Sequence, residues 1–159
     1  MSFSNNQKLI GGDEKMFIIG LIDNFFYRVI GVDSRPKFWG NNFEFYEKSI
    51  SISVSSRARD TDCLFIRFGT IWNSENKKEI VIEQIDFRKE LCHLDVSIKL
   101  LLILCEIAEK FSYQTIRFLK PSWVLVGEYI CFKFGFSSNN EIDPKKLKLR
   151  LKKYLSEKA

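Results

Sequence analysis

The segment from Ile80 to Phe136 constrains the fold most, because apolar runs of two different lengths alternate along it. In chain order it holds a short run at 80–87, a long Leu-rich run at 97–111, a short run at 115–119 and a final run at 122–136. Short runs rich in Ile, Val and Phe are typical of buried strands, whereas apolar positions three and four apart are typical of a helix. The segment therefore predicts strand, helix, strand, helix, with the polar stretch 88–96 as the turn before the first helix.

Two further strand-like runs precede this segment, at Phe43–Ser55 and at Cys63–Trp72. Both are rich in aromatic and β-branched residues, and polar residues separate them, as in successive strands of an antiparallel meander. The run Met16–Ile30 is ambiguous, and we expect it to begin as a short strand and to continue as a helix from Asp23. Together these elements predict an α+β fold with a mixed, largely antiparallel sheet flanked by helices.

The length of 159 residues and the hydrophobic share of 45% suit one well-buried domain. We assign this domain to residues 16–143, a disordered lead to 1–15 and a separate basic helix to 144–159. The longest apolar run, Leu100–Cys105, is too short to span a membrane, and the lead lacks the pattern of an export signal. The expected location is therefore cytoplasmic.

The order and spacing of these elements resemble the GNAT superfamily of N-acetyltransferases. In that family a strand leads into a glycine-containing phosphate turn, then a Leu-rich helix, a strand, and a helix that ends in Gly-Phe. The positions that carry the resemblance, without a gap, are Phe87, Leu100, Leu101, Ile116, Phe118 and Gly135-Phe136. The resemblance implies a GNAT-like fold and, for an ordinary member, acetyl-CoA as cofactor.

The same alignment implies that the cofactor site is degraded. The phosphate turn would comprise Phe87, Cys92, His93, Asp95, Val96 and Ser97. The family's two glycines fall on Asp95 and Ser97, and its basic residue falls on Cys92. Glycine lets backbone N–H groups approach a pyrophosphate, and a carboxylate at this place would repel one. We therefore expect no cofactor, and Asp95 is expected to cap the helix that begins near Ser97 instead.

The resemblance also implies where catalytic residues would lie if the chain were active. Glu83 stands at the general-base position, on the strand face that Val81, Ile85 and Phe87 are expected to share, where burial would raise the pKa of its carboxyl. Cys131 stands at the general-acid position. The alternatives are that Glu83 points to solvent or pairs with a Lys or Arg on a neighbouring strand, and that Cys131 is a small core residue.

Metal binding is not expected from the ligand residues of this chain. It has one histidine, His93, and four cysteines without a Cys-x-x-Cys pair. Such cysteines are typical of buried free thiols in a reducing compartment.

Basic charge is concentrated at the end of the chain. Residues 144–159 hold seven Lys or Arg and one Glu, a charge of +6 against a total of +5. Leu147, Leu151, Tyr154 and Leu155 share one side of a helix that Pro144 can open. The candidate binding residues on this predicted helix are Lys145, Lys146, Lys148, Arg150, Lys152 and Lys153. They are either the solvated side of a docked helix, or contacts to nucleic-acid phosphates, or contacts to a membrane surface or an acidic protein.

Two functions follow from these patterns. The first is a binding or regulatory module for nucleic acid or a protein partner, on a GNAT-like fold that has lost acetyl-CoA binding and is therefore a pseudoenzyme. The alternative is a divergent, active N-acetyltransferase that uses acetyl-CoA on an amine of a protein, a small molecule or an aminoacyl-tRNA.

Overall fold

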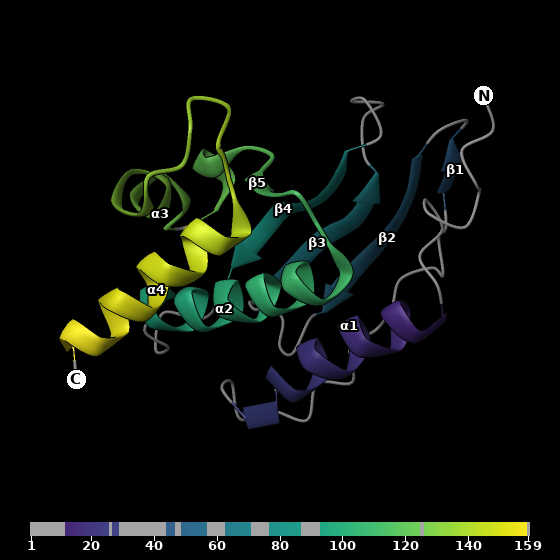
Figure 1. The fold of residues 1–159 in the computed structure, drawn as a ribbon, viewed down its shortest axis with the longest axis horizontal. Helices are drawn as coiled ribbons and strands as arrows, with labels where there is room; N and C mark the ends of the chain where they lie inside the picture. The colour runs from purple at the N-terminus through teal and green to yellow at the C-terminus, as the bar shows by residue number, and fades with distance from the viewer. Residues whose placement is uncertain are drawn as a thin grey trace.

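The computed structural model describes residues 12–25, 27–28, 44–46, 49–56, 63–70, 77–86, 93–124 and 126–158. Its elements are, in chain order, α1 (Gly12–Phe25), β1 (Glu44–Tyr46), β2 (Ser49–Ser56), β3 (Cys63–Thr70), β4 (Lys78–Asp86), α2 (His93–Phe111), β5 (Thr115–Phe118), the 3-10 helix η3 (Pro121–Trp123), α3 (Gly127–Phe134), β6 (Glu141–Ile142) and α4 (Pro144–Lys158). Figure 1 shows their arrangement.

The strands form one open sheet in the order β1-β2-β3-β4-β5-β6. β1 to β4 are antiparallel neighbours, β5 runs parallel to β4, and β6 is antiparallel to β5. A parallel pair requires a crossover connection, which α2 provides. The predicted α+β class with a mixed, largely antiparallel sheet is therefore confirmed. β3 and β4 are the second and third predicted strands. The first, Phe43–Ser55, is wrong as a single strand, because it contains β1 and β2, which pair with each other.

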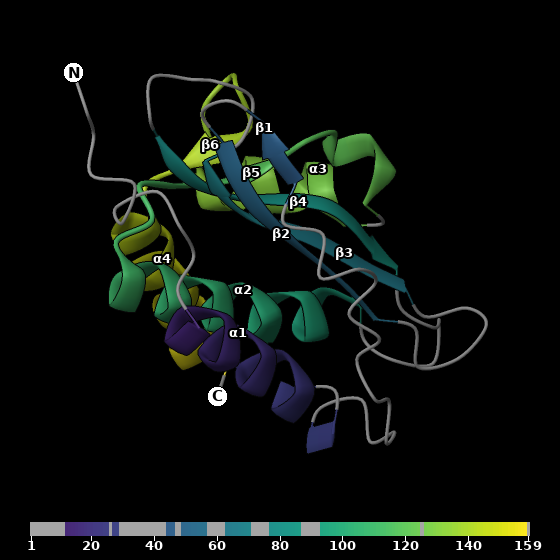
Figure 2. The same cartoon turned by 90° about the vertical axis from the view of Figure 1, so that its right-hand side faces the viewer.

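Helices α1, α2 and α4 cover one face of the sheet (Figure 2). Their apolar side chains join the inward-facing side chains of β3, β4 and β5 in one buried cluster, which includes Ile18, Phe68, Ile80, Leu104 and Leu147. Burial of such side chains is the main force that holds the layers together. No helix in the described part of the chain is long and apolar enough to cross a membrane.

The first helix differs from the sequence prediction. α1 is helical from Gly12, so the strand expected near Met16 is wrong, and residues 12–15 belong to the helix and not to a disordered lead. Glu14, Ile18, Ile22 and Phe25 are buried at helical spacing. The apolar run by itself is compatible with the period of a strand or of a helix, and packing against α2 stabilises the helix. Residues 1–11 lie outside the described part of the chain.

Helix α2 begins at His93, four residues earlier than expected, so the last part of the predicted turn 88–96 is wrong. Val96 and Ile98 are both buried in the main cluster, and Leu94 packs against it half-buried. The apolar stripe of α2 therefore begins before Ser97, and burial of these side chains stabilises residues 93–96 as part of the helix.

The final predicted helix, 122–136, is instead η3 followed by the shorter helix α3. Gly127 explains the break, because a Cβ there would lie 2.4 Å from the carbonyl oxygen of Pro121. Only glycine permits this close return of the chain. The predicted end at Gly-Phe is confirmed, since Gly135 caps α3 at a φ of 74°.

Candidate functional site

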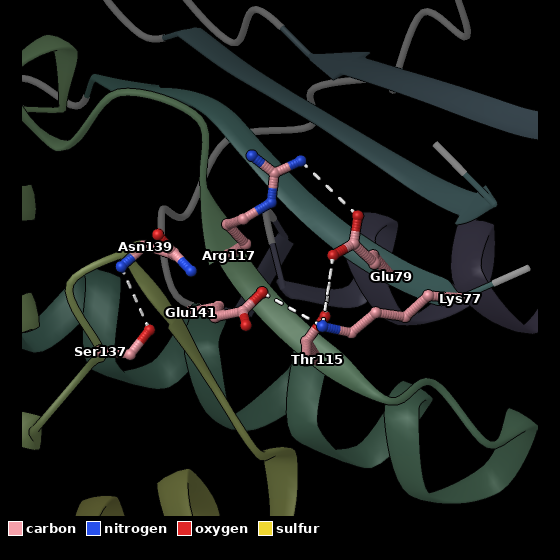
Figure 3. Close-up of polar contacts among 7 residues, drawn as sticks. All are labelled: Lys77, Glu79, Thr115, Arg117, Ser137, Asn139 and Glu141. Carbon is pink, nitrogen blue, oxygen red and sulfur yellow. Dashed lines mark hydrogen bonds and ion pairs between the residues drawn. The ribbon is translucent and has the colours of Figure 1, made fainter. Parts of the chain in front are cut away.

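A network of charged side chains lies on the sheet face turned away from α2. In Figure 3, Glu79 on β4 and Thr115 and Arg117 on β5 project to the same side of the sheet, with helices behind the strands. The parallel register explains their meeting, because it sets Glu79 opposite Thr115 and Val81 opposite Arg117. β6 adds Glu141, which is paired with Arg117 in the antiparallel register.

Glu79 is the centre of this network, with only 4% of its surface exposed. The Thr115 hydroxyl donates to Glu79 Oε1 over 3.2 Å, and Arg117 Nη2 lies 3.6 Å from Oε2. Lys77 Nζ lies 3.9 Å from Glu79 Oε1 and donates to Glu141 Oε2 over 3.2 Å. A buried carboxylate needs such partners, and here they tie β4, β5 and β6 together.

Figure 3 also shows the turn that leads into β6. The backbone N–H of Asn139 donates to the hydroxyl of Ser137 over 3.3 Å, and Asn140 takes a φ of 61°. Asparagine tolerates this backbone conformation better than most residues. The turn brings Glu141 back beside β5, within reach of Lys77.

Glu83, the predicted general base, is the extra residue of a β-bulge. Phe65 pairs with Gln84 and Ile66 with Ile82, so Glu83 has no partner in the β3–β4 register. The bulge shifts the alternation, and Ile85 faces the core together with Ile82. The expectation that Glu83 and Ile85 share a face is therefore wrong. Phe87, also expected on that face, lies outside the described residues.

The Glu83 side chain pairs with an arginine on the neighbouring strand, as the alternative prediction stated. Arg67 Nε donates to Glu83 Oε2 over 3.0 Å, and both side chains are largely buried. The Arg67 guanidinium also lies 5.6 Å from the centre of the Phe65 ring. The ion pair with Arg67 links the bulge of β4 to β3, so the position of the Glu83 carboxylate is explained by a structural role.

Cys131, the predicted general acid, lies half-buried on α3 and packs against the main cluster. Burial raises the pKa of its thiol to about 11, so the thiol is neutral at pH 7. A second thiol, Cys105 on α2, borders a cavity of about 290 Å³ between the end of α2 and the start of α4. Burial raises the pKa of Cys105 to about 12. Both thiols therefore lack the thiolate character of a reactive cysteine.

The described part of the predicted phosphate turn is the first turn of α2. Val96 and Ser97 are buried there, and Asp95 accepts a hydrogen bond from Lys158 at the end of α4. Asp95 is inside the helix, so its predicted role as the residue that caps it is wrong. Asp95 and Ser97, the positions that the resemblance assigns to glycines, carry side chains, and a side chain there would crowd a pyrophosphate. Cys92 lies outside the described residues, and for His93 only the backbone is described.

All four residues of β5 pair with β4, and β5 then ends at Phe118. The last backbone contact between them is the N–H of Leu119, which donates to the carbonyl of Ile82 over 2.9 Å. β5 then turns into η3, whereas β4 continues to Asp86.

α4 docks on the domain through its apolar side. Leu147 and Leu151 are fully buried, and Tyr154 and Leu155 pack half-buried against the cluster. Lys148 Nζ donates to Glu109 Oε2 on α2 over 2.5 Å. Arg150 Nη1 donates to the carbonyl oxygen of Phe134 over 2.7 Å, which joins α4 to the end of α3. The helix therefore has a fixed orientation, with a defined side toward solvent.

Docking divides the basic residues of α4 into two sets. Lys148, Arg150 and Lys158 have the partners described above. Four others are exposed, and none of them forms an ion pair with another described residue: Lys145, Lys146, Lys152 and Lys153. They lie in two rows, each of two lysines seven residues apart, on either side of Leu149, which is 72% exposed. These four lysines are the part of the predicted binding set that is available to a partner.

Exposed aromatic rings also lie on η3 and α3, and Lys133 links α3 to Tyr154 of α4. Trp123 is 60% exposed, Tyr129 48% and Phe132 88%. Lys120 Nζ lies 4.6 Å from the Trp123 ring, and Lys133 Nζ lies 6.0 Å from the Tyr129 ring and 5.2 Å from the Tyr154 ring. We call Lys120, Trp123, Tyr129, Phe132, Lys133 and the four exposed lysines of α4 the ring–lysine surface.

Sequence reasoning did not identify the ring half of this surface, because it placed 122–136 in one long apolar helix. One signal was present, since α3 has more apolar and aromatic residues than one side of a short helix can bury.

Comparison of the chain with protein-family models, with curated proteins and with solved structures finds no match.

Proposed function

We propose that this chain is a binding protein on a GNAT-like fold and that its partner is a nucleic acid, whose phosphates contact the exposed lysines of α4. The observation that carries the proposal is the division of charge on α4, in which Lys145, Lys146, Lys152 and Lys153 face solvent from a docked helix. Docking fixes their positions, so binding does not require the helix to fold first.

The arrangement of the four lysines suits a polyanion. Residues seven apart on a helix lie two turns apart, about 10 Å along the axis, and each row has this spacing. A phosphate backbone offers regularly spaced negative charges over such a distance. Each phosphate that a lysine neutralises releases condensed counterions, so binding of this kind weakens steeply with salt.

Salt-dependent binding of a labelled oligonucleotide duplex, followed by fluorescence anisotropy, tests this proposal. In the variant Lys152→Gln/Lys153→Gln we expect the log–log slope of affinity against salt to become shallower, by about 0.9 for each phosphate that the substituted side chains no longer neutralise. The matched control is Lys99→Gln/Lys110→Gln, which removes the same charge from two exposed positions of α2. Equal effects of the two pairs, or no binding at low salt, would refute the proposal.

The second candidate is a divergent N-acetyltransferase, and the order β4, α2, β5, α3, with Gly135 directly after α3, favours it. The start of α2 argues against acetyl-CoA binding, since the side chains of Asp95 and Ser97 would crowd a pyrophosphate and the Asp95 carboxylate would repel it. Calorimetric titration of acetyl-CoA separates the candidates, and we expect no binding at sub-millimolar ligand. A micromolar isotherm, with acetylation of an amine that Glu83→Gln abolishes, would establish the enzyme.

A further inference from the structure

The exposed rings of η3 and α3 lie outside the buried core cluster. On α3 the inward positions are Ile130 and Phe134, which are buried in the main cluster. Phe132 points the other way and is 88% exposed, Trp123 is 60% exposed and Tyr129 is about half exposed. Large rings presented to water on the surface of a folded domain are typical of a place where another molecule is bound.

Cations accompany these rings. Lys120 lies over the Trp123 ring, and Lys133 lies between the rings of Tyr129 on α3 and Tyr154 on α4. The acidic neighbours are Glu128 and Glu157 on the same two helices, both exposed, and Glu109 on α2, whose carboxylate lies near Lys145 and Lys152. With Lys145, Lys146, Lys152 and Lys153 the surface remains strongly basic, so its partner is negatively charged.

The two halves of the surface are held together rigidly. The Phe134 and Tyr154 rings pack edge to face with their centres 5.8 Å apart, and Arg150 bonds the carbonyl of Phe134. The same guanidinium reaches the carbonyl of Gly135 at 3.5 Å. The rings of α3 therefore keep a constant position relative to the lysines of α4.

We propose that the ring–lysine surface binds single-stranded nucleic acid in preference to duplex. The inference rests on the proposed function and names its ligand class. A single strand offers both phosphates for the lysines and unstacked bases for the rings, and base–aromatic stacking is how sequence-independent single-strand binders gain affinity. A duplex hides its base faces, so Trp123, Tyr129 and Phe132 contribute nothing to binding it.

Anisotropy titrations of the full chain with a fluorescein-labelled oligo(dT) and with a duplex of equal length, at one salt concentration, test the inference. We expect tighter binding to the single strand. Tyr129→Ala/Phe132→Ala should weaken single-strand binding roughly tenfold for each base that no longer stacks on a ring, and should leave duplex binding unchanged. Lys152→Gln/Lys153→Gln should weaken both. The ring control is Tyr27→Ala, which removes an exposed ring near the end of α1.

The outcomes separate this inference from the function on which it rests. Equal affinity for both ligands, with no effect of the ring variant, overturns the single-strand preference while nucleic-acid binding stands. Absence of binding to either oligonucleotide overturns both. Binding of poly-glutamate with the same sensitivity to the ring variant would assign the surface to an acidic protein instead. Because both substituted rings are exposed, an unchanged melting temperature shows that a drop in binding does not come from unfolding.

Discussion

Glu79 is a charged side chain almost completely enclosed by its partners. Replacement by glutamine keeps its size but removes the charge that Arg117 and Lys77 face. Breaking a hydrogen-bonded ion network of this kind from one side leaves the remaining charges poorly compensated. The effect should therefore be on stability, because the network joins three strands.

We expect Glu79→Gln to lower the free energy of unfolding by about 1 to 3 kcal/mol, measured by urea denaturation. The control is Glu106→Gln, the same substitution at an exposed position of α2, which should change stability by less than about 0.5 kcal/mol. Equal midpoints for the two variants would mean that the network of Glu79 adds nothing to stability.

The meeting of Glu79 with Arg117 was not predictable from the sequence. The two residues are far apart along the chain, and their contact depends on the parallel register of β4 and β5. The hydrophobic period and the composition of a segment predict that it forms a strand, but they do not predict which residues of two strands are paired. Glu83 illustrates the same limit, since its bulge depends on how β3 and β4 pair.

At the scale of elements, the sequence was informative where a single residue determines the local backbone conformation. Gly135 ends α3 as expected, because glycine adopts a positive φ without strain. The ambiguity of the run from Met16 was resolved by packing on α2, which the sequence does not specify. The break before Gly127 depends on a close approach to Pro121 that is visible only in three dimensions.

Gly135 offers a test of this view of α3. An added Cβ would lie 2.4 Å from Arg150 Nη1, at a φ of 74°. We expect Gly135→Ala to lower stability by about 1 to 2 kcal/mol, through backbone strain and a displaced guanidinium. Gly20→Ala, with open space around it inside α1, should raise stability by about 0.5 to 1 kcal/mol. Thermal melts of both variants check the opposite signs, and a destabilised Gly20→Ala would contradict the placement of α1.

At the scale of the whole molecule, α4 is part of the core and also carries the proposed binding surface. Its stripe of leucines was evident in the sequence, but whether that stripe packs on the domain or on a partner was left open. The structure places Leu147 and Leu151 against the domain. The predicted boundary between a domain at 16–143 and a separate helix is therefore not a boundary in the packing.

Two leucines of the same helix provide a matched test. Leu151 is fully buried and Leu149 is 72% exposed. We expect Leu151→Ala to lower stability by roughly 2 to 5 kcal/mol and Leu149→Ala to have almost no effect. Urea denaturation of both variants measures the difference. Similar small effects for the two would show that α4 is not docked in solution.

The docking of α4 on α2 also sets an order of events during synthesis on the ribosome. α2 leaves the exit tunnel well before residues 144–158, so the side of α2 that Leu147 and Leu151 will cover stays open to water meanwhile. Nascent chains at this stage should be ready clients of ribosome-associated chaperones. A stop codon that removes α4 should therefore lead to degradation of the product in the cell. It should not produce a stable domain that lacks only the proposed binding lysines.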